Sequence, residues 1–151
     1  MLSISALQQF IHDHIPLSTT MGVEVLAATP DGVTLAAPLE PNINHLDTVF
    51  GGSSSAVAIL SAWGLLYVRL REEFPNASIV IQRNTMRYQR PISSAFTASS
   101  FLPDPAAWDR FTKAFRRKHR ARLSIGSLLY CNGEQVGELD AAFVALGLKT
   151  A

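Results

Sequence analysis

Cysteine is almost absent from this sequence, and so is any surplus of charge. The single cysteine, Cys131, excludes an internal disulfide and leaves neither a CxxC pair nor a Cys/His metal pattern. Thirteen Lys and Arg residues stand against twelve Asp and Glu residues, a formal charge of +1, so no global field favours nucleic acid or a membrane. The N-terminal residues lack the basic and apolar regions of a signal peptide. These absences predict a cytoplasmic protein without a metal site or cofactor.

The sequence does hold one long uncharged run, from Ser53 to Val68. Small residues and leucines predominate in it, and it is longer than a usual strand of about 4 to 8 residues. Because it is apolar nearly all round, we expect a helix that the rest of the fold encloses. Gly64 costs a helix roughly 1 kcal/mol relative to alanine, which indicates close approach by another backbone. The run is too short and too rich in serine for a transmembrane span, which needs about 20 mainly apolar residues.

The rest of the chain predicts strands and short helices around that helix. With 151 residues, 48% of them hydrophobic, the chain is long enough for one compact domain over 1–151. Helices are expected at 5–15 and after Asp104-Pro105, a cap with proline at the first helical position. Residues typical of turns flank six β-prone runs, at 23–29, 33–39, 78–90, 96–102, 120–130 and 134–148. This order predicts an α+β fold in which long strands wrap one buried helix.

A polar loop and two adjacent glycines precede the uncharged run. Amides at a helix start have no partner within the helix, so Gly51 and Gly52 would present theirs to an anion or a polarised carbonyl. Polar side chains around them could orient or activate a water, and these are Asn42, Asn44, His45, Asp47, Thr48, Ser54 and Ser55. The hydroxyls of Ser54 and Ser55 could instead donate hydrogen bonds to backbone carbonyls one turn back in the helix. No G-x-S-x-G elbow is present, which argues against a serine nucleophile.

Basic residues are concentrated in one segment. Seven of the thirteen cations lie there, namely Arg110, Lys113, Arg116, Arg117, Lys118, Arg120 and Arg122. The segment is either a solvated face or a site for phosphates, because guanidinium groups pair well with phosphate. Arg87 and Arg90, at the end of a predicted strand, are a second phosphate candidate. Aromatic residues are not interleaved for base stacking, so nucleic acid is not the expected partner.

The loop and glycines carry a resemblance to a known family. The stretch from Asn44 to Gly52 is similar to the signature N-x-x-G-T-x-H-G-G of the hotdog-fold thioesterases. Four positions match, while Asp47 replaces a glycine and Phe50 replaces a histidine. The stretch Met86–Pro91 resembles the family's strand motif ending in an aromatic, x, Arg and Pro. A closer resemblance is to the branch that also occurs as the C-terminal domain of some acetyltransferase-like proteins, through 41–45, 48–53, 62–64 and 120–122.

This resemblance implies an antiparallel sheet around a central helix, and a thioester carbonyl polarised by an amide among Phe50 to Gly52. In the family an acidic residue acts from the position of Asn44 or of Ile59, and neither is acidic here. Asp47 is the only carboxylate between Glu40 and Glu72, so it is the expected base, with His45 as the alternative.

The function expected from the resemblance is hydrolysis of an acyl-CoA or acyl carrier protein thioester by a homodimer or a dimer of dimers. The expected substrate contacts are Asn42, Thr48, Phe50, Ser54, Ser55, Arg87, Arg90, Arg116, Arg117 and Arg120. Two alternatives remain open at this point. One is a non-catalytic acyl-CoA binding domain, and the other is an acyl hydratase in which His45 and Asp47 form the acid–base pair.

Overall fold

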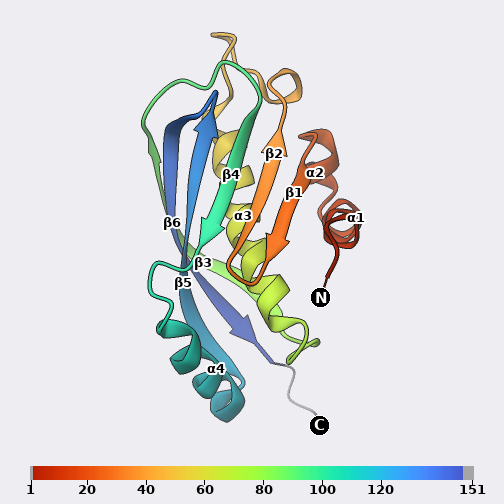
Figure 1. Cartoon of the computed structure of the whole chain (residues 1–151), viewed down its shortest axis with the longest axis vertical. Helices are drawn as coiled ribbons and strands as arrows, with labels where there is room; N and C mark the ends of the chain where they lie inside the picture. Colours follow the sequence, from red (N-terminus) through yellow and green to blue (C-terminus); the bar gives the residue numbers. More distant parts are fainter. Residues whose placement is uncertain (1, 148–151) are drawn as a thin grey trace.

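The computed structural model describes residues 2–147, in which helices and strands alternate much as the sequence predicts (Figure 1). The elements are α1 (Ile4–His14), α2 (Pro16–Thr20), β1 (Glu24–Thr29), β2 (Gly32–Ala37), a 3-10 turn η1 (Glu40–Asn42), α3 (Gly51–Leu70), β3 (Ser78–Tyr88), β4 (Phe96–Phe101), α4 (Ala107–Lys118), β5 (Arg120–Cys131) and β6 (Glu134–Leu146). The predicted end of the last strand, Leu148, lies outside the described residues. The sequence does not predict the short helix α2, which begins at Pro16 directly after α1.

The six strands form one antiparallel sheet in the order β1-β2-β4-β5-β6-β3. The sheet curves around α3, which packs against all six strands. Strands β1 and β3 are therefore the two edges of the sheet. Helix α1 packs beside β1, whereas most of β3 is exposed to solvent.

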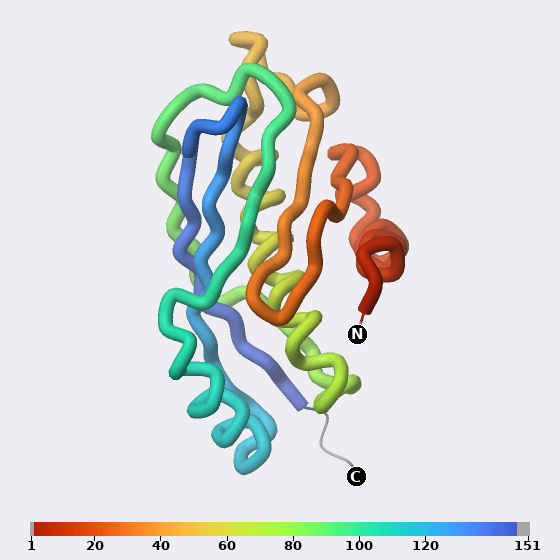
Figure 2. Tube along the Cα trace, viewed as in Figure 1, coloured from red at the N-terminus to blue at the C-terminus, as the bar shows by residue number. Residues whose placement is uncertain are grey.

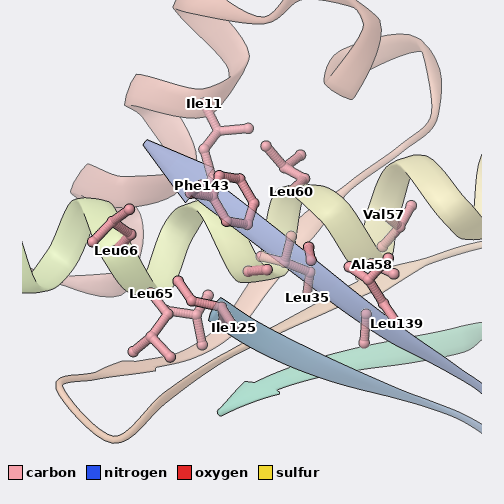
Figure 3. Packing of buried hydrophobic residues seen from close by; sticks show 14 of the residues in the cluster. Ile11, Leu35, Val57, Ala58, Leu60, Leu65, Leu66, Ile125, Leu139 and Phe143 are labelled. Atoms are coloured by element: carbon pink, nitrogen blue, oxygen red, sulfur yellow. The ribbon is translucent and has the colours of Figure 1, made fainter. Parts of the chain in front are cut away.

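The core forms between α3 and the inner face of the sheet (Figure 3). Leu65 of α3, Ile125 of β5 and Phe143 of β6 are fully or almost fully buried in it. By length and composition alone α3 could cross a membrane, but 61% of its apolar window is buried inside the fold. The neighbour of Gly64 is the side chain of Val33, whose Cγ1 would lie 3.3 Å from an added Cβ, and not the backbone that the sequence suggested.

Helix α4 packs on β5 at one end of the molecule (Figure 2), and its Phe115 contacts Phe74, just beyond α3. It begins at Ala107, so Asp104 is not its cap. The Asp104 carboxylate instead accepts from the Ala106 amide at 3.1 Å and pairs with Arg110 at 2.9 Å. Arg69, near the end of α3, donates to the carbonyl of Pro30 and stacks over Trp108 at 4.8 Å. Burial lowers the pKa of Arg69, an effect that the charge of Asp31 partly offsets.

Candidate functional site

The loop before α3 is organised around the side chain of Asn44. Its amide nitrogen donates to Thr48 Oγ1 at 2.9 Å and to the Val49 carbonyl at 3.4 Å. Its oxygen accepts from the amides of Leu46 and Thr48, at 2.8 and 3.2 Å. The backbone closes the same turn, since the Asn44 amide donates to the Thr48 carbonyl at 2.8 Å. Both polar atoms of the Asn44 side chain therefore have hydrogen-bond partners within the loop.

The start of α3 leaves backbone amides free. Phe50 is the residue before the helix, and its own amide donates to the Asn42 carbonyl at 2.7 Å, so Phe50 cannot supply the polarising amide. The amides of Gly51 and Gly52 donate to no acceptor within residues 2–147. The Phe50 ring lies over Gly52, where an added Cβ would clash with Phe50 Cε2. Gly51 lines the cavity in front of α3, whereas Gly52 does not.

A cavity of about 350 Å³ lies in front of Gly51. Its lining includes Thr48 from the loop, Ser54 from α3 and Leu129 from β5, together with Met86 and Tyr88 from β3 and Arg90 just beyond that strand. Most of the lining is apolar or uncharged, so the cavity suits an acyl group next to a polar helix start. No Asp or Glu lines it.

Tyr88 is a site residue that the sequence analysis assigned no role. Its hydroxyl donates to the Gly51 carbonyl at 3.2 Å, and its ring would lie 3.3 Å from a Cβ added at Gly51. A side chain at position 51 would therefore push against the ring. The signal was present in the Met86–Pro91 motif, but only the fold shows that this aromatic lies against the first residue of α3.

Asp47 and His45, the two candidate bases, lie on the exposed part of the loop. Asp47 has a left-handed backbone with φ of 60°, a conformation that Asp and Asn tolerate better than most residues. Its side chain makes no hydrogen bond or ion pair in the described part of the chain. Neither residue lines the cavity, although Thr48, next to Asp47, does.

The predicted substrate contacts Asn42, Ser54 and Ser55 differ in their position relative to the cavity. Asn42 is buried, and its amide donates to the carbonyls of Met21 and Pro38 at 2.9 and 2.8 Å. Ser54 lines the cavity, but its hydroxyl donates to the Gly51 carbonyl at 3.0 Å. Ser55 is half-buried and is not part of the lining.

The predicted phosphate contacts fall in three places. Arg90 lines the cavity, and it pairs with Glu134 at 2.9 Å. Arg87 lies between Met86 and Tyr88 on β3, so it points to the outer face of the sheet, where it pairs with Glu138 at 3.2 Å. The prediction for Arg87 thus does not fit this cavity.

The remaining predicted cations lie around α4, at the far end of the molecule from the loop (Figure 1). Arg116 donates from Nε to Glu73 at 2.9 Å and stacks over Phe74. Arg117 and Arg120 make no ion pair within the described ranges. The structure therefore separates the basic segment from the helix start within one chain.

An antiparallel sheet wrapped around one long helix, with a cavity at the start of that helix, defines the hotdog fold of thioesterases. The chain belongs to the family Putative thioesterase (yiiD_Cterm), whose sequence model matches residues 4–147. Both the predicted fold and the predicted family are confirmed.

Solved structures agree with this assignment. A protein of unknown function from Chlorobaculum tepidum TLS is 30% identical, with a TM-score of 0.90, covering 97% of this chain and 98% of its own. A putative thioesterase from Shewanella oneidensis is 27% identical, with a TM-score of 0.84 and coverage of 95% and 96%. A probable thioesterase from Pseudomonas aeruginosa is 19% identical, with a TM-score of 0.82 and 97% of both chains covered, and this likeness shows the fold alone.

Proposed function

We propose that the protein hydrolyses an acyl-CoA thioester in the cavity at the start of α3. The observation that carries this proposal is the free amide of Gly51. This residue opens a long buried helix and lines a cavity of mostly apolar or uncharged residues. Such an amide, aided by the helix dipole, stabilises the negative charge that develops on a thioester carbonyl oxygen. The acyl chain then packs among the apolar residues of the lining, such as Met86, Leu129 and Val136.

Asp47 is proposed to activate the attacking water. It is the carboxylate closest in sequence to Gly51, and the hydrogen bonds of Asn44 hold the loop that carries it. The water attacks the carbonyl carbon while Asp47 accepts a proton from it. The C–S bond then breaks, and Asp47 returns the proton to the leaving thiolate, which releases the acid and the free thiol. This step needs no metal or redox cofactor.

The active form is proposed to be a dimer formed through β3. This strand is an edge of the sheet with an open row of backbone groups, and Val80 and Ile81 on it are 47% and 39% exposed. Beside it runs an apolar groove of about 360 Å³, to which Ile59, Trp63 and Ile81 contribute. An edge strand with exposed apolar residues is normally paired or covered.

The loop in front of α3 supports the same dimer. Leu46 and Phe50 are 69% and 58% exposed, which is unusual for large apolar side chains next to a binding cavity. A second copy docked on β3 would cover this flank and complete the surroundings of Asp47. The twofold symmetry of such a dimer gives two equal sites.

A panel of acyl-CoA esters of increasing chain length, assayed by release of free thiol, tests the proposed reaction. We expect turnover of at least one ester above the uncatalysed rate. Wild-type protein that binds these esters and releases no thiol from any of them would refute hydrolysis.

One observation favours a second candidate, a non-catalytic acyl-CoA binding domain. Within residues 2–147 no carboxylate lines the cavity. Ile59, at a position that is acidic in related enzymes by the resemblance above, lines the apolar groove instead. The same panel decides between the two, because a binding domain would give saturable binding without thiol release.

A further inference from the structure

The first half of β5 has a neighbouring strand on one side only. Strand β6 pairs with β5 from Arg120 onward, whereas β4 pairs with it only from Gly126 onward. The chain leaves the sheet after Phe101, and Pro103 has no backbone N–H with which to continue the pairing. Within the described residues, 120–125 of β5 therefore form an internal free edge in an otherwise continuous sheet.

The hydrogen-bond register shows which backbone groups lie on this free edge. The Gly147 amide donates to the His119 carbonyl at 2.8 Å, so the odd-numbered residues that follow on β5 direct their backbone groups toward β6. In an antiparallel pair successive residues alternate, and Arg122 and Ser124 therefore direct theirs to the vacant side. These groups have no hydrogen-bond partner within residues 2–147. Such a row of groups is a template for another strand.

A cavity of about 570 Å³ runs beside the free edge, between α4 and β5, and we call it the α4 groove. Helix α4 lies along this part of β5 (Figure 1). The wall of the groove includes Ala107 and Ala114 of α4 and the buried side chains of Ala121 and Leu123 of β5. An extended segment that paired with β5 would thus set every second side chain against an apolar wall.

The other face of the free edge is basic. Arg120 and Arg122 alternate with buried residues, so their side chains share the exposed face of β5. Within the described ranges neither makes an ion pair, and neither does Arg117. Arg110, in the lining of the groove, is already paired with Asp104. The free edge therefore carries an excess of positive charge on its exposed face.

This charge selects among the possible occupants. A second copy presenting the same edge would set arginines opposite Arg120 and Arg122, and like charges across a strand pair are destabilising. Nucleic acid would need exposed aromatic rings for its bases, whereas Phe111, the aromatic residue in the lining, is buried. Carboxylates opposite the arginines are stabilising. The occupant is expected to be acidic on one face and apolar on the other.

We propose that the free edge of β5 binds an extended acidic segment of a partner protein, which adds a strand antiparallel to β5 where β4 has left the sheet. Main-chain hydrogen bonds to Arg122 and Ser124 supply affinity, as in other cases of strand addition. The acidic side chains of the segment lie beside Arg120 and Arg122, and its alternate apolar side chains lie in the α4 groove. This surface is separate from the cavity at Gly51.

A capped, fluorescent peptide of alternating Glu and Val residues tests the proposal by fluorescence anisotropy. We expect saturable binding to the wild-type protein, and binding at least about tenfold weaker when Gln replaces Glu, the usual scale for charged hydrogen bonds. Arg120→Gln combined with Arg122→Gln should weaken binding of the Glu peptide by a similar factor. The matched control is Arg83→Gln with Arg87→Gln, which removes equal charge from β3 and should leave affinity unchanged.

Strand addition is tested separately from charge. In the antiparallel pair the Glu residues lie opposite Arg120 and Arg122, so their backbone nitrogens donate to β5. Methylation of the Glu nitrogens should abolish binding, whereas methylation of the Val nitrogens should leave it nearly unchanged. Hydrogen exchange measured by NMR gives the protein's side of the pair, and the amides of Arg122 and Ser124 should exchange more slowly when the peptide is bound.

Three results would overturn the proposal. One is wild-type protein that does not bind the Glu peptide at millimolar concentration. Another is binding that leaves the exchange of the Arg122 and Ser124 amides unchanged, because charge alone would then explain it. The third is displacement of the peptide by a single-stranded oligonucleotide at lower concentration than by unlabelled peptide, which would assign the basic face to nucleic acid. All three measure binding, so they are independent of whether the protein releases thiol.

Discussion

At the scale of single residues, Asn44 determines the shape of the loop that would hold the reactive water. Five hydrogen bonds link its side chain to Leu46, Thr48 and Val49. An amide side chain both donates and accepts, and this loop uses both capacities. The residue aligned with the acidic position of related thioesterases is therefore a structural support here, and Asp47 is left as the nearby carboxylate.

Replacing Asn44 with alanine should weaken both the fold and the reaction. We expect the free energy of unfolding to fall by about 1–3 kcal/mol, since amides and a hydroxyl lose their partners. Because the loop would no longer hold Asp47, kcat should fall as well. Urea unfolding and thiol release measure the two effects. Asn44→Asp, which keeps the acceptor for Leu46 and Thr48, should cost less stability, and equal stability of Asn44→Ala and wild type would contradict this account of the loop.

At the scale of helices and strands, the sequence predicted most of the architecture. The length and composition of the uncharged run located α3. The turn Asn132-Gly133, with φ of 52° and 78°, joins β5 and β6 where turn residues separate two predicted strands. Partners distant in sequence could not be predicted in this way. That Arg116 meets Glu73, and that Tyr88 meets Gly51, depends on how α4 and β3 pack against α3. Such contacts cannot be predicted from the spacing of residues along the chain.

Arg69 provides a test of how these elements are held together. It joins α3 to the β1–β2 turn through the Pro30 carbonyl and to α4 through Trp108. Arg69→Met keeps the aliphatic length and removes the guanidinium, so we expect a loss of about 1 kcal/mol in urea unfolding. Arg71→Met is the matched control, because the interactions of the Arg71 guanidinium within residues 2–147 are with Tyr67 of the adjoining helix α3. If Arg71→Met lowers the free energy of unfolding as much as Arg69→Met does, the link that Arg69 makes between elements contributes nothing to stability.

At the scale of the whole molecule, the exposed flank formed by β3, the apolar groove and the loop before α3 is the proposed dimer surface. A lysine in place of Ile81 would set a charge on the edge strand next to that groove. Charged residues on an edge strand oppose pairing with another strand. We expect Ile81→Lys to sediment as a monomer at micromolar concentration and to lose thioesterase activity.

The control lies on the opposite edge of the sheet. Glu24→Lys changes an exposed residue of β1, and the protein should remain a dimer. If Ile81→Lys is also a dimer with wild-type activity, the subunits do not associate through β3.

The central claim is that Asp47 activates water beside the Gly51 amide, and the kcat of Asp47→Asn measures it most directly. The substitution keeps the size of the side chain and removes the base. We predict that kcat for the best acyl-CoA ester falls by about 10²-fold or more, the usual scale for general base catalysis, while KM and stability stay near wild type and His45→Gln retains turnover. Wild-type kcat in Asp47→Asn, with turnover lost in His45→Gln, would contradict the account and assign the base to His45.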